Sequence, residues 1–170
     1  MKKLLLSALL LLAFTTTNAQ NKFSVDVNYP FLIGDNSTSD ALNGTIDLGV
    51  KWNFIHISKL DLGLGVDYGY LNGDTFDGNA SYVKPKVNAE IKILKLSPYA
   101  QLGYTFVNTS FDGGGSASND GINATIGLKW HIFIPKLYIN AAYDYTSFSD
   151  GDGSYEKSFA IGKIGIGLQL

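Results

Sequence analysis

The clearest pattern in the chain is a strict alternation of apolar and polar positions over residues 60–71. A period of two residues places successive side chains on opposite faces of a β-strand. The segment therefore predicts a long strand with one apolar face and one narrow polar face. The apolar face carries Leu60, Leu62, Leu64, Val66, Tyr68 and Tyr70. The other face carries Asp61, Gly63, Gly65, Asp67 and Gly69.

The same alternation recurs in seven further segments, which predicts eight strands joined alternately by long loops and short turns. This pattern indicates an all-β fold, a closed antiparallel up-and-down eight-stranded β-barrel. The predicted strands cover 22–33, 44–54, 60–71, 82–93, 99–106, 122–131, 137–146 and 163–170. The long loops, rich in Gly, Asp, Ser and Asn, cover 35–43, 72–80, 108–120 and 149–157.

Two local details are also predicted. A hairpin centred on His56 would place Lys51 opposite Asp61 and Trp52 opposite Leu60. Pro85 lies inside a predicted strand. Because proline cannot donate to a β-ladder, we expect a bulge or a position at the barrel rim there.

Alternation alone leaves open which face lies inside the barrel. A soluble lipocalin-like barrel would turn the apolar face inward around a ligand, whereas a transmembrane barrel turns it outward into lipid. Four features favour the transmembrane form. The strands are long enough to cross a bilayer, the loops are long at one end only, and the polar face is rich in glycine. Aromatic side chains also gather at both strand ends, as at membrane interfaces.

These aromatic side chains predict two girdles on the lipid-facing surface. The girdle near the long loops comprises Tyr29, Phe31, Tyr68, Tyr70, Tyr104, Phe106, Tyr143 and Tyr145. The girdle near the short turns comprises Phe23, Trp52, Phe54 and Trp130.

The first residues predict export from the cytoplasm. Lys2 and Lys3 precede an apolar run, and Ala19 follows small and polar residues, which is typical of a cleaved signal peptide. We therefore expect residues 1–19 to be removed and residues 20–170 to form one barrel domain in the outer membrane. The chain has no Cys and no Arg, and the mature part would carry a net charge near −4. This argues against nucleic-acid binding.

With these features the chain resembles the small outer-membrane β-barrels that include OmpA barrel domains and OmpX. The resemblance covers the whole mature chain and rests on the signal, the eight strands, the girdles and the final strand. It implies a Gram-negative cell envelope, assembly by the barrel-assembly machinery, and a role in envelope integrity or adhesion. Leu170 stands where this family usually ends on an aromatic residue, which weakens the expected assembly signal.

The polar face would line the lumen and carries equal numbers of acidic and basic residues. Buried charges persist when they are paired and hydrogen-bonded, and an eight-stranded barrel is just wide enough for its side chains to fill. We therefore expect a lumen plugged by ion pairs, with a narrow or gated ion pathway as the alternative. The predicted lumen network comprises Asp26, Asp47, Lys51, Asp61, Asp67, Lys84, Lys86, Glu90, Lys92, Lys129, Asp144 and Lys163.

The sequence gives no catalytic, cofactor or metal site. Some barrels of this size modify lipid A with a loop-side histidine, but His56 and His131 both lie beside short turns. The segment 150–156 is faintly similar to a calcium loop, yet Asp-Gly pairs chiefly form turns. Gly113–Gly115 lack the residues of a phosphate-binding loop.

We therefore predict a monomeric, non-enzymatic outer-membrane barrel with a structural or surface-interaction role. Its predicted partners are outer-membrane lipids and an unknown extracellular ligand at the four long loops. The first alternative is a narrow pore or an OmpW-like route for small or apolar molecules. The second is a soluble lipocalin-like ligand-binding barrel.

Overall fold

The computed structural model describes residues 22–33, 42–73, 78–132, 136–148 and 158–170. The predicted signal peptide, most of the predicted loop 35–43 and the whole predicted loop 149–157 lie outside these residues. The strands are β1 (Lys22–Ile33), β2 (Leu42–Ile57), β3 (Leu60–Gly73), β4 (Gly78–Ile91), β5 (Leu96–Phe111), β6 (Ser116–His131), β7 (Leu137–Phe148) and β8 (Ser158–Gln169).

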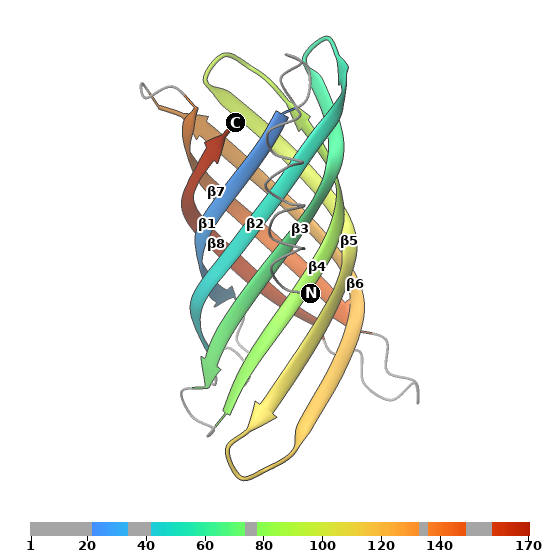
Figure 1. Ribbon diagram of the computed structural model, residues 1–170, viewed down its shortest axis with the longest axis vertical. Coiled ribbons are helices and arrows are strands. Elements are labelled where there is room, and N and C mark those ends of the chain that lie inside the picture. The colour runs from blue at the N-terminus through green and yellow to red at the C-terminus, as the bar shows by residue number, and fades with distance from the viewer. Residues whose placement is uncertain (1–21, 34–41, 74–77, 133–135, 149–157) are drawn as a thin grey trace, which may run out of the picture.

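Each strand pairs antiparallel with its neighbour in sequence, and β8 pairs with β1 to close the barrel. The predicted fold class, a closed eight-stranded up-and-down barrel, is confirmed (Figure 1). In the described part of the chain, no helix is long and apolar enough to span a membrane.

The alternation in the sequence decides which side chains enter the barrel. Apolar residues on one parity, such as Val27, Leu64 and Ile126, are exposed on the outer surface. The other parity is buried inside the barrel and is mostly polar or charged, as with Asn28 and Thr125. The outer surface is therefore suited to lipid, whereas the interior must satisfy its polar groups internally.

Three short connections lie at one end of the barrel, which we call the turn end; the other is the loop end. Ser58, Leu94 and Lys136, one in each connection, have a left-handed backbone with φ of 55°, 56° and 71°. Tight hairpin turns need such conformations to match strand twist. The C-terminus also lies at the turn end, where the Leu170 amide donates to the Phe23 carbonyl at 2.7 Å.

The hairpin between β2 and β3 differs from its prediction. The turn consists of Ser58 and Lys59 because Ile57 pairs with Leu60, so the hairpin is not centred on His56. A register shift between Asn53 and Ile55 accommodates the extra residue as a β-bulge. The predicted Lys51–Asp61 and Trp52–Leu60 oppositions are therefore wrong.

The pairs are instead Lys51 with Gly65 and Trp52 with Leu64. The bulge reverses the parity, so Phe54 and Ile55 are both exposed on the outer surface. The alternation of apolar and polar residues along the sequence gives no sign of this inserted residue.

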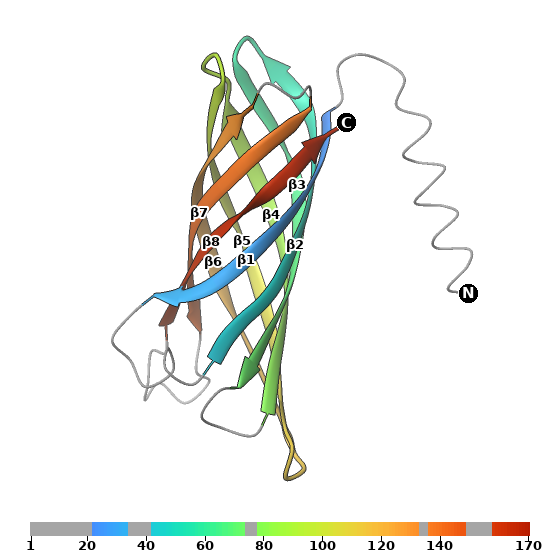
Figure 2. The same cartoon turned by 90° about the vertical axis from the view of Figure 1, so that its left-hand side faces the viewer.

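Two predicted loops are shorter than expected because the strands continue into them. Most of 108–120 belongs to β5 and β6, which leaves a turn at 112–115, and most of 72–80 belongs to β3 and β4. The β5–β6 hairpin reaches beyond the other strands at the loop end (Figure 1 and Figure 2).

The outer part of β6 lies beyond its neighbour on one side. Its pairing with β7 begins only at Gly121, whereas its pairing with β5 continues to Ser116. Among the described strands, none pairs with the second edge of residues 116–120. Among the residues that the structure describes, this stretch is therefore unpaired on one side; residues 149–157, which follow β7, lie outside them.

Pro85 lies in the middle of β4, opposite Val66 of β3, so the predicted rim position is wrong. No bulge forms there either. The β4–β5 pairing is interrupted at Lys84 and Pro85 and resumes at Lys86 in the same register. Proline lacks an amide hydrogen, so the ladder loses a bond without any insertion of a residue.

Candidate functional site: the barrel lumen

The structure places all twelve predicted lumen charges on the inner side of the barrel. Eleven are buried, and only Lys92, whose side chain is 27% exposed, reaches the turn-end opening. Their strands hold them there because inward positions alternate with outward ones along every strand. Charges in such surroundings need partners.

The carboxylate of Asp144 is the centre of the largest cluster. Lys84 donates to Oδ1 at 2.6 Å and Lys86 donates to Oδ2 at 2.8 Å. The Thr125 hydroxyl and the Asn123 amide also donate to this carboxylate, at 2.9 and 2.6 Å. Lys163 lies 3.6 Å from Oδ2 as well. Three cations and two neutral donors therefore share one buried anion, which links β4, β6, β7 and β8 through their side chains.

Lys163 connects this cluster to the opposite wall. Its ammonium donates to Asp47 at 2.7 Å and to Asp67 at 2.9 Å, while Lys86 also donates to Asp67 at 2.8 Å. The Tyr82 hydroxyl donates to Asp47 at 2.6 Å. The ion pairs around Asp47, Asp67 and Asp144 thus form one connected network across the lumen.

Two further pairs lie nearer the turn end. Lys51 donates to Asp26 at 2.5 Å, so its partner comes from β1 and not from the predicted Asp61. Lys129 donates to Glu90 at 2.6 Å. Inside a low-dielectric interior, such pairs stabilise a fold mainly by avoiding the cost of an unpaired charge.

Asp61 has a different set of neighbours at the turn-end opening. His56 contacts it through Nδ1 at 2.7 Å, Lys92 is hydrogen-bonded to it, and Lys22 lies 3.9 Å away. The other histidine, His131, lies 3.2 Å from the Ser97 hydroxyl. Both histidines are therefore at the turn end, as predicted.

Three inward tyrosine rings occupy space left by glycines on neighbouring strands. Tyr82 is paired with Gly69, Tyr99 with Gly127, and Tyr138 with Gly167. At each glycine a Cβ atom would collide with the facing ring. The sequence predicted the inward glycines but not that their role is to admit these rings.

The rings also contact the charges. The ammonium of Lys51 lies 4.6 Å from the centre of the Tyr99 ring, and that of Lys84 lies 4.4 Å from the Tyr82 ring. Cation–π contacts of this kind are strongest where water is excluded. The rings therefore fill the lumen and help to stabilise the buried cations.

At the loop end the lumen contents become apolar, which the sequence analysis missed. Leu71, Ala80, Tyr82 and Ile161 are buried together, with Leu32, Val107 and Phe159 packed against them. These residues occupy inward parities of their strands, and that parity was the available signal. Because some predicted strands stopped too early, Ala80 fell in a predicted loop, and Val107, Phe159 and Ile161 fell outside the predicted strands. We call these seven residues the apolar seal.

Along β3 and β4 the inward side chains follow a fixed order from the turn end. Asp61 opposes Glu90, Asp67 opposes Lys84, and beyond them Leu71 opposes Ala80. Along these two strands the inward side chains are thus charged toward the turn end and apolar at the loop end, where the apolar seal lies.

The predicted girdle residues all lie on outward parities. Ten are exposed and two, Phe23 and Tyr70, are half-buried. Neighbouring rings contact each other in pairs, Trp52 with Phe54 at 5.1 Å and Tyr104 with Phe106 at 5.2 Å between ring centroids. Because β5 continues to Phe111, Tyr104 and Phe106 lie inside their strand and not at its end.

Comparison with known proteins identifies the class of fold. The chain is similar to the crystal structure of Ail, the attachment invasion locus protein of Yersinia pestis, with a TM-score of 0.57 and 16% identity over 88% of this chain and 97% of that one. It is also similar to Neisserial surface protein A, with a TM-score of 0.55 and 15% identity over 89% and 97% of the two chains. The chain has the fold of the small eight-stranded outer-membrane β-barrels.

A third similar structure is a major outer membrane protein of Thermus thermophilus, with a TM-score of 0.54 and 14% identity over 90% of this chain and all of that one. No protein-family model matches the chain. No curated protein matches it by sequence either. At these identities the likeness concerns the small-barrel fold and leaves the function to the residues of this chain.

Proposed function

We propose that this protein is a non-enzymatic outer-membrane barrel that serves as a stable scaffold and presents an interaction surface outside the cell. The exposed apolar outer face and the two girdles support a location in a bilayer. The ion-pair network and the apolar seal support a scaffold without an open pore. Outer-membrane lipids and the barrel-assembly machinery are the partners that this role requires.

The observation that carries the surface role is the open edge of β6. Residues 116–120 are exposed, project beyond β7 and have no described strand on their second side. An unpaired strand edge presents a row of amide and carbonyl groups, which another extended chain can continue as an added strand. We infer that the extracellular partner is a protein segment in extended conformation.

A lipid-modifying enzyme receives no support from the residues of this lumen. The chain has two histidines, His56 and His131, and both lie at the turn end, away from the outer leaflet. Among the described residues, no group of His, Cys, Asp or Glu could hold a metal ion. The predicted extracellular calcium loop lies outside the described residues and stays a prediction.

Amide hydrogen exchange of the barrel in lipid nanodiscs tests the proposed surface. The probe is an eight-residue peptide of alternating Thr and Val, chosen as a generic strand. We expect it to slow exchange selectively at residues 116–120. Equal exchange rates at residues 116–120 with and without the peptide would contradict strand addition.

Two proline variants sharpen this test. Successive residues of a strand point their amides in opposite directions, so one of Ser116→Pro and Ala117→Pro removes a donor from the open edge while the other removes a donor from the β5 pairing. We expect the edge-donor variant alone to lose the peptide effect while keeping the β5–β6 hairpin. Equal retention of peptide protection in both variants would count against the edge.

A further inference from the structure

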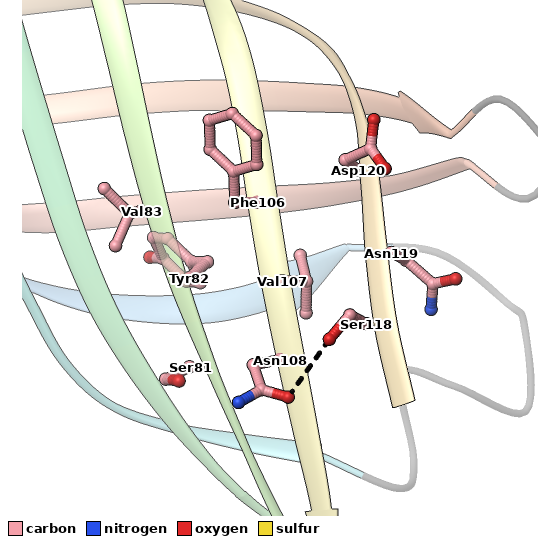
Figure 3. Close-up of a pocket in the computed structure, with 9 residues that line it drawn as sticks. All are labelled: Ser81, Tyr82, Val83, Phe106, Val107, Asn108, Ser118, Asn119 and Asp120. Atoms are coloured by element: carbon pink, nitrogen blue, oxygen red, sulfur yellow. Dashed lines mark hydrogen bonds between the residues drawn. The ribbon is translucent and has the colours of Figure 1, made fainter. Parts of the chain in front are cut away.

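A separate hollow of about 320 Å³ lies on β4, β5 and β6 near the loop end (Figure 3). Register places two outward rows of side chains across these three strands. One row consists of Ser81, Asn108 and Ser118, which are mutual neighbours in the two ladders. The other row consists of Val83, Phe106 and Asp120.

The two rows combine an exposed aromatic ring with polar side chains. Phe106 exposes 52% of its surface, and Asn108 and Ser118 supply an amide and a hydroxyl beside it. The Ser118 hydroxyl donates to Asn108 Oδ1 at 3.4 Å, and the Tyr104 hydroxyl donates to the Asp120 carboxylate. These contacts place the polar groups beside the aromatic ring.

The residues lining the hollow include a carboxylate and no basic side chain. A phosphate, sulfate or carboxylate group would therefore meet a like charge and no cation. A hydroxyl-rich or amine-bearing group would meet acceptors at Asp120 and Asn108 and donors at the serines and the asparagine amide. Charge thus selects against anions and favours neutral or cationic polar ligands.

The hollow lies where the outer surface changes from apolar to polar. On the turn-end side the next outward pair on β5 and β6 is Tyr104 with Ile122, and on the loop-end side it is Ser110 with Ser116. Aromatic rings at such a boundary occupy the headgroup level of a bilayer. A ligand seated on Phe106 would therefore lie at the height of lipid headgroups.

We propose that this hollow binds a neutral or amino sugar ring, which packs its apolar face on Phe106 and hydrogen-bonds to Asn108, Ser118 and Asp120. Its volume lies at the small end of ligand pockets, which suits one or two sugar rings. The sugar can be the headgroup of a glycolipid in the surrounding leaflet or a free saccharide. This inference rests on the proposed outer-membrane location but not on the edge of β6 as a peptide-binding surface.

The test uses the whole barrel, isotope-labelled, in a detergent without a sugar headgroup. Free glucosamine and N-acetylglucosamine are the probes, and glucose 6-phosphate is the anionic control. We expect saturable chemical-shift changes at residues 81–83, 106–108 and 118–120 with the two probes and none with the phosphate. Absence of saturable shifts at these residues, or an equal response to glucose 6-phosphate, would overturn the proposal.

Variants assign the binding to the hollow. Phe106→Ala and Asn108→Ala should each weaken the affinity for N-acetylglucosamine at least tenfold. Trp130→Ala is the matched control because Trp130 is an outward aromatic residue of equal exposure, 52%, at the turn end. The affinity of the Trp130→Ala variant for N-acetylglucosamine should equal that of the wild type. Unchanged affinity in both hollow variants would reject the site, and a gel-mobility shift on heating verifies that each variant is folded.

Nanodiscs distinguish the two sources of the sugar. One set contains a monoglucosyl diacylglycerol and the other contains phosphatidylethanolamine alone. Shifts at the hollow in the first set identify a lipid headgroup as a ligand, and shifts with free sugar in the second set identify a soluble one. Absence of shifts in both sets would overturn the proposal while leaving the peptide test of the β6 edge unaffected.

Discussion

The ring of Tyr99 on β5 lies directly over Gly127 on β6, its partner in the antiparallel register. Any side chain larger than hydrogen at Gly127 would occupy the same space as the ring. The Tyr99 hydroxyl donates to Asn140 Oδ1 at 2.9 Å, which fixes the ring in that position. Tyrosine and glycine are thus a complementary pair across the lumen wall.

The variant Gly127→Ala should displace the Tyr99 ring and destabilise the barrel. Overpacking of this kind costs about 1–3 kcal/mol. Urea unfolding in lipid vesicles measures the change. The control is Gly113→Ala, because a Cβ there meets nothing within 4 Å. Equal stability of the two variants would show that the ring has room to move.

The partner of Lys51 can be tested by a double-mutant cycle. Lys51→Ala leaves the buried Asp26 carboxylate without its cation, and we expect a loss of about 3–5 kcal/mol in the free energy of unfolding. Adding Asp26→Asn should recover part of this loss. Adding Asp61→Asn should recover none, since Asp61 contacts His56 and Lys92 instead. Recovery of stability in Lys51→Ala by Asp61→Asn but not by Asp26→Asn would instead support the Lys51–Asp61 pairing predicted from the sequence.

If the apolar seal is packed, truncation of an inward side chain of β8 should destabilise the barrel more than truncation of an outward one. Ile161→Ala removes a fully buried side chain from the lumen and should cost about 2–5 kcal/mol. The matched control is Ile166→Ala on the same strand, whose side chain is exposed on the outer surface. It should cost clearly less in the same urea titration. A reversed order would mean that the seal is not packed.

A filled lumen should carry no steady current. We expect the purified barrel to show no discrete conductance steps in a planar bilayer, because the proposed scaffold has its lumen filled by the charge network and the apolar seal. The double variant Tyr82→Ala and Ile161→Ala removes two seal residues. It is the positive control and should show conductance steps. Defined steps in the wild type that change with Lys86→Ala would instead support the narrow-pore alternative.

Closure of the barrel should make its migration on a gel depend on heating. Each described strand pairs with two neighbours and the sheet closes on itself, so the folded form should resist SDS until it is boiled. Comparison of unheated and boiled samples of the outer-membrane fraction measures this directly. A soluble protein without a mobility shift would favour the lipocalin-like alternative.

The sequence alone determined the features that depend on alternation and chain order. Because side chains alternate along a strand, the twelve inward charges and the twelve outward aromatics could be assigned from parity, and the even strand number with alternating connections predicted the closed barrel. Residue type also suggested that the charges would pair. None of these inferences required knowledge of which residues meet across the lumen.

Only the tertiary structure decided the partners. The turn at Ser58 and Lys59, together with the one-residue bulge near Phe54, placed Lys51 opposite Gly65 and not Asp61, and the Lys51 ammonium pairs with Asp26 on β1. The extension of β5 and β6 beyond the described end of β7 left residues 116–120 without a described partner on one side, and the register of three strands assembled the hollow around Phe106. Register and strand length depend on pairing between segments distant in sequence, so a pattern read along one strand cannot specify them.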